Sequence, residues 1–283
     1  MTTLDEWITK SVKNIIHISE TAHLDVAILA RKVCMLDRST LGASSHIRLN
    51  EQQLESLEYF LTRRLQGEPI AYIVGEKDFW TLTLMVNRDT LIPRPETELL
   101  VECVLEKIDC QKKIRILDLG TGSGAIALSL GKECPRLDIV GTDISQKALA
   151  VATTNSKLNG VSNVQFISGN WLDAVPGQQF SIIACNPPYI ANNDRQIETI
   201  HTRFEPQSAL VSGEDGLEAL RHIIPLAYEA LLPGGWLILE HGYNQKPSVN
   251  NLLSDANFAS ITHASDLAKT ARVSMGQKAQ RVK

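Results

Sequence analysis

The feature that most restricts the possible folds is an alternation that runs from Ile114 to the C-terminus. Short apolar runs there are separated by longer segments with the apolar spacing of helices. The apolar runs predict strands at residues 114–119, 138–142, 164–167, 180–185 and 236–240, followed by a terminal pair near 260–263 and 272–275. Alternating strands and helices are typical of an α/β domain with a mostly parallel sheet. We therefore expect one such domain over residues 96–283.

The residues before this domain follow a different pattern. From Leu4 to about Gln66, apolar residues recur every three or four positions, which predicts a small bundle of helices. Over residues 75–95, short aromatic and β-branched runs replace that spacing and predict a β-hairpin. We therefore predict a helical domain over residues 1–74, linked by the hairpin to the α/β domain.

Composition excludes several classes of protein. The formal net charge of −4 argues against a protein that holds nucleic acid mainly by neutralising phosphates. The five cysteines are scattered and contain no CxxC pair, so we expect no structural zinc, no other metal site and no disulfide scaffold. The N-terminus has no basic leader, and no apolar run approaches the ~18 residues that cross a bilayer, which favours a cytoplasmic protein without membrane contact.

A glycine-rich segment lies between the first predicted strand of the α/β domain and the following helix, which makes it a candidate cofactor loop. Its spacing is GxGxG, unlike the GxGxxG of dinucleotide enzymes. Asp118 stands just before the turn, where a carboxylate would repel a pyrophosphate but attract the ammonium and sulfonium of S-adenosylmethionine. The candidate S-adenosylmethionine-binding residues of the loop are Gly120, Thr121, Gly122, Ser123 and Gly124.

Asp143 is a further candidate cofactor contact, because it ends the next predicted strand, about twenty residues after the loop. A carboxylate there can accept hydrogen bonds from both ribose hydroxyls, although an NAD-dependent enzyme uses such an acid too. Glycines at a strand-to-helix turn can also serve packing alone. The combination of strand, glycine turn, helix, second strand and terminal aspartate favours the functional interpretation. Ser145 and Gly160 are the predicted caps of the next helix.

A tetrapeptide, Asn186-Pro187-Pro188-Tyr189, follows the strand predicted at residues 180–185. Ligands of open α/β sheets bind at the carboxyl ends of strands, so this loop should face the glycine turn. The Asn186 side-chain oxygen and the Pro187 carbonyl can each accept one N–H of a planar amide or amino group, and Tyr189 offers a ring for stacking. Pro188 adds stiffness to the loop.

These residues suit methyl transfer to a poorly nucleophilic nitrogen. Two hydrogen bonds contribute only ~0.5–1.5 kcal/mol each, whereas positioning two reactants can lower a barrier by about 7–11 kcal/mol. We therefore expect orientation to dominate, without a general base. The alternative interpretation of the tetrapeptide is an ordinary proline-stiffened turn.

On these residues, the chain resembles the release factor glutamine methyltransferases, the HemK/PrmC family, over essentially its whole length. Beyond the two loops, the resemblance rests on residues 67–73, 79–80, 91–98, 204–206, 209–210 and 239–242. It implies a class I methyltransferase domain, which is Rossmann-like with a mostly parallel sheet. It also implies that the N-terminal helical domain helps to recognise a release factor.

The resemblance further implies an S-adenosylmethionine-dependent protein-glutamine N-methyltransferase, which methylates the side-chain amide of the glutamine in the Gly-Gly-Gln motif of peptide chain release factors. The family's cofactor positions correspond here to Gly120 through Gly124, Asp143, Trp171 and Asn186. Its substrate positions correspond to Asn186, Pro187, Pro188 and Tyr189, of which we predict Asn186, Pro187 and Tyr189 to be catalytic. Asn170 stands where relatives often have an acid near adenine, so a charge-assisted bond is lost. The segment 269–272 also departs from the family pattern, and its role stays open.

Several alternatives stay open. Trp171 is either a wall for adenine or a core aromatic residue. The substrate base of an adenine or cytosine amino-methyltransferase would present the same two N–H groups to Asn186 and Pro187. Such an enzyme must flip its base and is expected to carry a target-recognition region and a basic surface, neither of which this sequence shows clearly. A non-catalytic cofactor-binding regulator and an NAD-dependent oxidoreductase are the other candidates. We expect a monomer that binds release factors and does not bind nucleic acid directly.

Overall fold

The computed structural model describes residues 2–37, 46–194 and 202–280. The chain divides into two compact units, one built mainly from residues up to Glu76 and the other mainly from Lys77 onwards. Within the described ranges, no helix combines the length and apolar character that a membrane crossing requires.

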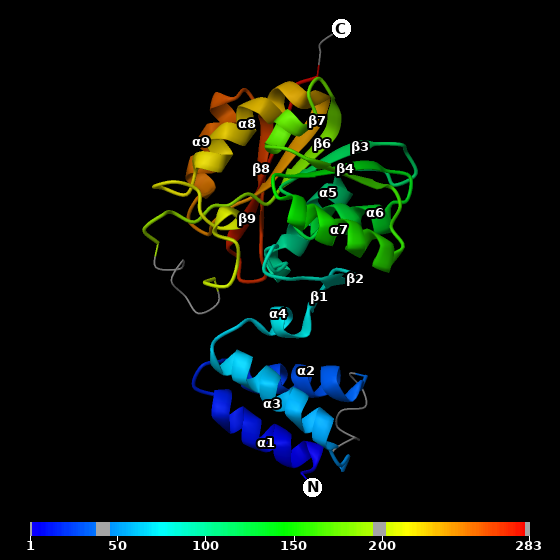
Figure 1. The fold of residues 1–283 in the computed structure, drawn as a ribbon. Helices are drawn as coiled ribbons and strands as arrows, with labels where there is room; N and C mark the ends of the chain where they lie inside the picture. The colour runs from blue at the N-terminus through cyan, green and yellow to red at the C-terminus, as the bar shows by residue number, and fades with distance from the viewer. Residues whose placement is uncertain (1, 38–45, 195–201, 281–283) are drawn as a thin grey trace. The chain divides into compact units, whose positions relative to one another are not determined.

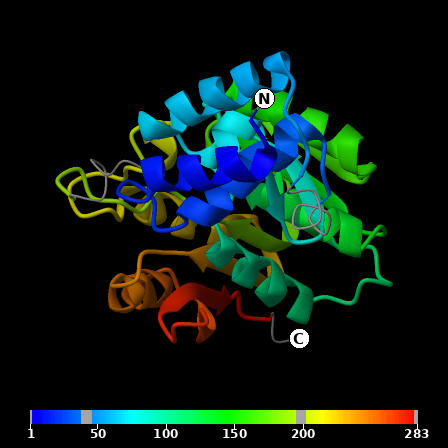
Figure 2. The same cartoon turned by 90° about the horizontal axis from the view of Figure 1, so that it is seen from below.

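The N-terminal unit is a helical bundle, as the sequence predicts. Its helices are α1 (Leu4–Ile15), α2 (Ala22–Cys34), α3 (Glu51–Leu65) and the short α4 (Ile70–Val74). The first three lie side by side in Figure 1 and Figure 2. Each buries one apolar face, and Trp7, Leu29 and Leu57 belong to the shared core.

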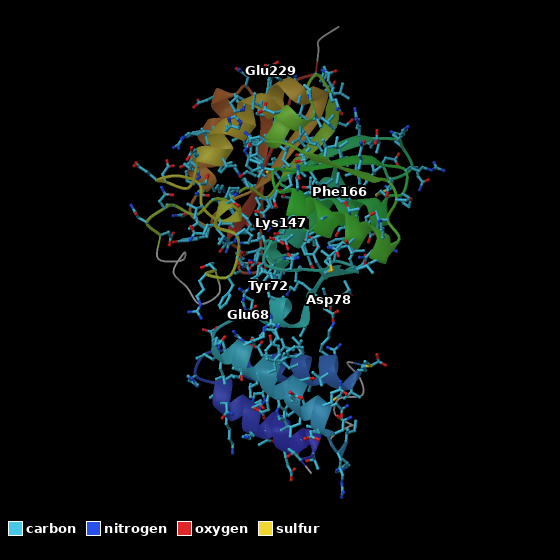
Figure 3. All side chains as sticks on the ribbon, viewed as in Figure 1. Glu68, Tyr72, Asp78, Lys147, Phe166 and Glu229 are labelled. Atoms are coloured by element: carbon cyan, nitrogen blue, oxygen red, sulfur yellow. A yellow bond between two sulfur atoms is a disulfide. The ribbon has the colours of Figure 1, made fainter. Side chains whose placement is uncertain are left out.

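Two arginines at the end of α3 fix its connection to α4. Arg63 donates two hydrogen bonds to the Glu68 carboxylate, at 2.7 Å and 2.9 Å, and a third to the Tyr72 carbonyl at 3.3 Å. Glu68 and Tyr72 are labelled in Figure 3. Arg64 is buried and pairs with Asp25 of α2 at 2.7 Å. Because bidentate arginine–carboxylate pairs are directional, this connection has a defined geometry.

The predicted β-hairpin consists of β1 (Glu76–Phe79) and β2 (Leu82–Met85), which form a separate two-stranded sheet. Its apolar side chains, including Phe79, belong to a core of the second unit. A carboxamide on a later helix holds β2, because Asn155 Oδ1 accepts the Met85 N–H at 2.7 Å and Asn155 Nδ2 donates to the Met85 carbonyl at 3.0 Å.

A seven-stranded sheet forms the centre of the second unit. Its strands are β3 (Arg115–Leu119), β4 (Asp138–Asp143), β5 (Val164–Ser168), β6 (Phe180–Cys185), β7 (Leu231–Glu240), β8 (Ala259–Ser265) and β9 (Ala271–Gln277). The order is β5-β4-β3-β6-β7-β9-β8, with β3 to β7 parallel and β9 antiparallel to both neighbours. The predicted, mostly parallel sheet is confirmed.

Helices cover both faces of this sheet (Figure 1). They are α5 (Glu98–Glu106), α6 (Ala125–Glu133), α7 (Gln146–Asn159), α8 (Glu218–Ala230) and α9 (Lys246–Asp255). Successive strand residues point to opposite faces. In β3, Ile116 therefore joins the core that contains α5 and α6, while Leu117 and Leu119 join the core that contains α8 and α9. The two cores hold the central strands rigidly from both sides.

The predicted caps of α7 are both present. The Ser145 side chain accepts the Ala148 N–H at 3.2 Å, and Gly160 ends the helix with a φ of 65°. The start of α7 is therefore fixed directly after β4, which matters for the site described below. The division of the chain at residues 74 and 95 stays a prediction.

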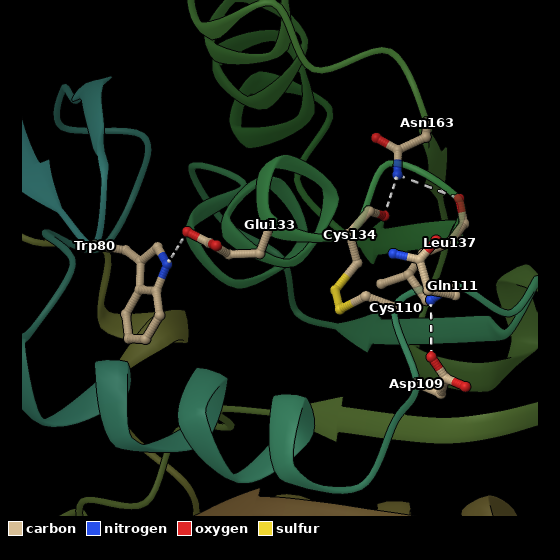
Figure 4. The surroundings of a disulfide bond; sticks show 8 residues. All are labelled: Trp80, Asp109, Cys110, Gln111, Glu133, Cys134, Leu137 and Asn163. Carbon is tan, nitrogen blue, oxygen red and sulfur yellow. Dashed lines mark hydrogen bonds between the residues drawn. A yellow bond between two sulfur atoms is a disulfide. The ribbon is translucent and has the colours of Figure 1, made fainter.

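A disulfide joins Cys110, in the connection from α5 to β3, to Cys134 at the end of α6 (Figure 4). The two cysteines are 24 residues apart in sequence, and their Cα atoms are 4.9 Å apart. We expected no disulfide scaffold, and this single bond corrects that expectation to one cross-link. Scattered cysteines do not reveal which of them the fold brings within bonding distance, so the pair could not be identified from the sequence.

Candidate active site

The fold brings three predicted segments to one edge of the sheet. Strand β3 pairs in parallel with both β4 and β6, so the carboxyl ends of these strands are neighbours. The glycine turn follows β3, Asp143 ends β4, and the Asn186 loop follows β6. One cavity is lined by residues of all three segments, among them Gly120, Gly122, Asp143, Asn170, Trp171, Asn186 and Pro188.

The glycine turn is tight because two of its positions exclude a side chain. Gly120 and Gly124 have φ angles of 70° and 86°, in the left-handed region that favours glycine. A Cβ at Gly120 would lie 3.2 Å from the Trp171 ring, and one at Gly124 would lie 2.8 Å from Leu128. A side chain at position 120 would therefore be strained by its φ and would press against the Trp171 ring.

The other predicted residues of the turn are buried beneath it. Thr121 and Ser123 are both buried, and neither they nor Gly124 line the cavity. The Ser123 carbonyl accepts a hydrogen bond from Asn155 Nδ2 at 2.9 Å, so the same carboxamide that holds β2 also supports the turn. The structure thus places Gly120 and Gly122 at the cavity, and it places their neighbours in supporting positions.

Asp143 connects the glycine turn to the start of α7. Its carboxylate accepts the Gly122 N–H at 2.9 Å through Oδ2 and the Ser145 N–H at 2.8 Å through Oδ1. An ionised carboxylate has about four acceptor positions, so two remain for a ligand. Asp143 lines the cavity and can accept hydrogen bonds from neighbouring hydroxyls of a bound molecule.

Asp118 is a fully buried carboxyl group directly beneath the turn. Its Oδ2 accepts hydrogen bonds from the Thr121 hydroxyl at 2.6 Å and from the Ala127 N–H at 3.2 Å. Its Oδ1 has no hydrogen-bond partner in the described part of the chain. Burial, aided slightly by the nearby charge of Asp143, raises the pKa of Asp118 to about 7, although the hydrogen bonds from Thr121 and Ala127 oppose this rise. Bound positive charge near this group would favour its ionised form.

Trp171 has a backbone conformation that is unusual for its residue type. Its φ is 47°, and the left-handed region costs a non-glycine residue about 1–3 kcal/mol. Such strain persists where the surroundings hold the residue in place, and here the indole packs over Gly120 and lines the cavity. Asn170, which precedes it, lines the same cavity. Trp171 is only half-buried and packs against the core that contains α8, so its ring is available to a ligand.

The Asn186 side chain is oriented by a neighbour that sequence reasoning missed. Asn186 Nδ2 donates to the Thr97 hydroxyl oxygen at 3.0 Å, which leaves Asn186 Oδ1 as an acceptor. Thr97 ends the short 3-10 helix Pro95–Thr97 and is buried. The threonine lies 89 residues before Asn186, so no local motif relates the two.

Tyr189, at the other end of the tetrapeptide, lines a second and polar cavity together with Glu240. The Tyr189 hydroxyl donates to Glu240 Oε1 at 3.4 Å. Burial raises the pKa of Glu240 to about 7, while hydrogen bonds from Thr97 and Tyr189 lower it. Burial also raises the pKa of Tyr189, so its hydroxyl stays protonated and acts as a donor. Glu240 is a second residue that sequence reasoning did not select.

Two arginines near the tetrapeptide form ion pairs. Arg94 forms an ion pair with Glu205, whose other carboxylate oxygen accepts the Ile92 N–H at 2.9 Å. Arg272 pairs with Asp266 at 3.0 Å, and Arg94 and Arg272 both line the cavity of Tyr189. Both arginines therefore place positive charge beside the Asn186–Tyr189 loop, although their own ion pairs partly neutralise it.

Comparisons with known proteins identify both parts of the chain. The family model "PrmC N-terminal domain" matches residues 6–75, and the model "Methyltransferase small domain" matches residues 95–216. A methyltransferase structure from Pyrococcus furiosus covers 77% of this chain and 97% of its own, with a TM-score of 0.54 and 19% identity. That likeness shows the class I methyltransferase fold.

Two curated relatives are close enough to show the family. The release factor glutamine methyltransferase of Coxiella burnetii is 43% identical over 92% of this chain and 94% of its own. The protein of the same name from Vibrio cholerae is 44% identical over 92% of this chain and 91% of its own. Because these matches span both units of the chain, the protein belongs to the release factor glutamine methyltransferase family.

Proposed function

We propose that this protein transfers the methyl group of S-adenosylmethionine to the side-chain amide nitrogen of the glutamine in the Gly-Gly-Gln motif of peptide chain release factors. The observation that carries the proposal is one shared cavity. The glycine turn, the Asp143 carboxylate and Asn186 all line it, so a cofactor and a substrate amide can meet there. Family membership supports the same substrate class.

The residues of the cavity fit S-adenosylmethionine. Asp143 keeps acceptor positions for the two ribose hydroxyls, and Trp171 offers a wall for adenine, whose amino group can donate to the Asn170 side-chain oxygen. The glycine turn permits close backbone approach. The buried Asp118, with one unpartnered oxygen, favours a ligand that carries positive charge over one that carries a pyrophosphate. When bound, this cofactor supplies an activated methyl group on a positively charged sulfur.

The tetrapeptide orients the substrate amide. Asn186 Oδ1 and the Pro187 carbonyl accept the two N–H groups, Pro188 stiffens the loop and Tyr189 stacks on the amide plane. The nitrogen held by these two acceptors would take the methyl group of the bound cofactor, whose sulfur would keep the electrons of the broken C–S bond, and would then lose one proton to water. Because orientation can supply about 7–11 kcal/mol, the loop needs no general base.

The location of the protein, its oligomeric state, its partners and the roles of its domains are also proposals. We place the protein in the cytoplasm, as a monomer that binds release factors and not nucleic acid, in keeping with its net charge of −4. We assign residues 1–74 to release-factor recognition, residues 75–95 to a linking hairpin and residues 96–283 to methyl transfer.

The test is methyl transfer from labelled S-adenosylmethionine to a release factor or to DNA, followed by mass spectrometry of the modified residue. Wild-type protein should label the release factor at one glutamine. Asn186→Ala should lower kcat by ~10²–10³-fold, as loss of one preorganised polar contact does in other enzymes, and should change the cofactor Kd far less.

Asn193→Ala is the matched control, because Asn193 is an exposed asparagine a few residues further along the same segment. It should transfer methyl groups at the wild-type rate. Label found only on DNA would reject the proposed substrate in favour of a nucleic-acid amino group. Unchanged transfer by the Asn186 variant would reject the mechanism.

A further inference from the structure

A carboxamide poses an orientation problem that the tetrapeptide alone does not solve. Its oxygen accepts hydrogen bonds and its nitrogen donates them, so rotation by half a turn exchanges the two functions. If Asn186 presented Nδ2 to a substrate amide, two donors would face each other and neither N–H would be held. Transfer to an amide therefore requires a contact that keeps the Asn186 oxygen toward the substrate.

Thr97 provides that contact through its hydroxyl oxygen. Asn186 Nδ2 donates to it at 3.0 Å, and Thr97 is only 4% exposed, so water is not a ready replacement. A hydroxyl can both accept and donate, however, and by itself it would not distinguish the two ends of the carboxamide. The direction of the contact depends on where the Thr97 hydroxyl proton goes.

The Thr97 hydroxyl donates its hydrogen bond to the Glu240 carboxylate. Its side chain is hydrogen-bonded to the Thr97 hydroxyl and also to the Tyr189 hydroxyl at 3.4 Å. In its ionised form, which prevails above its raised pKa of about 7, the Glu240 carboxylate only accepts. With its proton committed to Glu240, Thr97 can only accept from the next group, and the group that can donate is Asn186 Nδ2. The chain of bonds thus has one direction, from Asn186 through Thr97 to Glu240.

The same carboxylate reaches both ends of the tetrapeptide. It contacts Tyr189 directly and Asn186 through Thr97, and it ends β7, the strand beside β6. Glu240 is 1% exposed, and its Oε2 has no hydrogen-bond partner among the described residues. A buried acidic group that is not fully paired costs stability, so its position beside the reacting loop fits a role other than folding.

We infer that Thr97 and Glu240 are positioning residues that fix the carboxamide of Asn186 with its oxygen toward the substrate amide. This inference rests on the proposed function, because only a substrate with two N–H groups needs that orientation. The carboxylate sets the direction of the Thr97 hydroxyl, the hydroxyl holds the Asn186 nitrogen, and the Asn186 oxygen is thereby left for the substrate. Neither residue touches the transferred methyl group.

The test compares two threonine variants that differ only in the hydroxyl. Thr97→Val keeps the shape of the side chain and removes the acceptor, while Thr97→Ser keeps the hydroxyl and loses a methyl group. Thr97→Val should lower kcat about 10- to 100-fold, the range expected when a buried donor loses its partner. Its KM for the release factor and its Kd for S-adenosylmethionine should change less than about threefold. Thr97→Ser should recover most of the wild-type kcat.

Thr142→Val is the matched control, because Thr142 is also buried and its hydroxyl has no hydrogen-bond partner among the described residues. The same hydroxyl-to-methyl change there should leave kcat unchanged. A merely structural role of Thr97 predicts instead that the valine and serine variants lose activity together with cofactor affinity and melting temperature. That outcome, or full activity of Thr97→Val, would overturn the inference.

Glu240 is tested through Glu240→Gln, which keeps the size of the side chain but replaces one acceptor oxygen with a donor group. Its kcat should fall while its cofactor Kd stays near the wild-type value. Because both residues act on Asn186 in one path, the Thr97→Val, Glu240→Gln double variant should lose less than the product of the single losses. A loss of kcat equal to the product of the two single losses would place Glu240 outside this path and would refute its positioning role.

The wild-type reaction separates this inference from the proposed function. A wild-type protein that leaves release-factor glutamine unmethylated would refute the function itself, whatever the variants do. An active wild type with an equally active Thr97→Val variant would refute only the positioning role.

Discussion

Replacing Asp143 with alanine removes one carboxylate that serves both the protein and the proposed cofactor. Within the protein, its two oxygens accept the Gly122 N–H at 2.9 Å and the Ser145 N–H at 2.8 Å. Toward the cofactor, it offers the remaining acceptor positions to two ribose hydroxyls. Alanine therefore removes two ligand hydrogen bonds and also releases the turn that shapes the cavity.

The expected loss follows from the charge of the acceptor. A hydrogen bond to a charged group contributes about 1.5–3 kcal/mol, so two of them amount to at least about 3 kcal/mol. Each 1.4 kcal/mol is tenfold in affinity, and the Kd for S-adenosylmethionine should therefore rise by about 100-fold or more. The kcat at saturating cofactor should change much less, because Asp143 does not contact the substrate amide in the proposed mechanism.

Calorimetric titration with S-adenosylmethionine measures this change directly. Asp138→Ala is the matched control, because Asp138 begins the same strand at the opposite edge of the sheet and forms an exposed pair with Arg115 at 3.4 Å. Exposed pairs contribute about 0–1 kcal/mol, so this variant should bind like the wild type. Wild-type affinity in Asp143→Ala, or equal losses in both variants, would refute the proposed ribose contact.

Three further predictions concern stability, measured by denaturant unfolding without ligand. Burial raises the pKa of Glu240 from 4.5 to about 7, so the protonated carboxyl group stabilises the fold fully below pH ~4.5, and this stabilisation is lost as the pH rises through 7. Glu240→Gln should remove about 3 kcal/mol of the resulting decline in the free energy of unfolding. An unchanged pH profile would contradict the raised pKa. Cys110→Ser should lower the free energy of unfolding by about 3 kcal/mol, because it opens the loop of 24 residues that the disulfide closes. Dithiothreitol should abolish the difference between this variant and the wild type. Equal stability without reductant would contradict the disulfide. Gly124→Ala should destabilise the fold more than Gly160→Ala. Both positions have a positive φ, but only a Cβ at position 124 would meet a neighbour, Leu128 at 2.8 Å. Equal losses of unfolding free energy would refute this steric argument.

Much of the fold was predictable because hydrophobic patterns follow the periods of helices and strands. Every strand predicted in the α/β domain has a counterpart in the seven-stranded sheet. The start of β7 was missed, because Leu231 pairs with Phe180 before a register shift, and the Pro233–Gly235 stretch in between breaks the apolar run. Pairing partners across a sheet can override local residue preferences, and a single sequence does not contain them.

The candidate site was predictable where its residues are close together in sequence. The glycine turn and the tetrapeptide are contiguous, and Asp143 stands at a fixed distance from the turn, so local motifs revealed them. Thr97 and Glu240 lie in segments 91–98 and 239–242, on which the family resemblance rests, but sequence reasoning assigned them no role, because they meet Asn186 and Tyr189 only after β6 and β7 pair. The partners that orient a reacting group are thus less visible in sequence than the group itself.

The carboxamide of Asn155 has a practical consequence for dissecting this protein. It joins Met85 to Ser123, so the strand that precedes the catalytic fold acts as a brace for the turn beneath the cavity. A fragment that begins at residue 96 would lack this strand. The buried carboxamide of Asn155 would then lose its two hydrogen bonds to the Met85 backbone. A fragment meant to fold and catalyse on its own should therefore start no later than Glu76, so that it includes the whole hairpin.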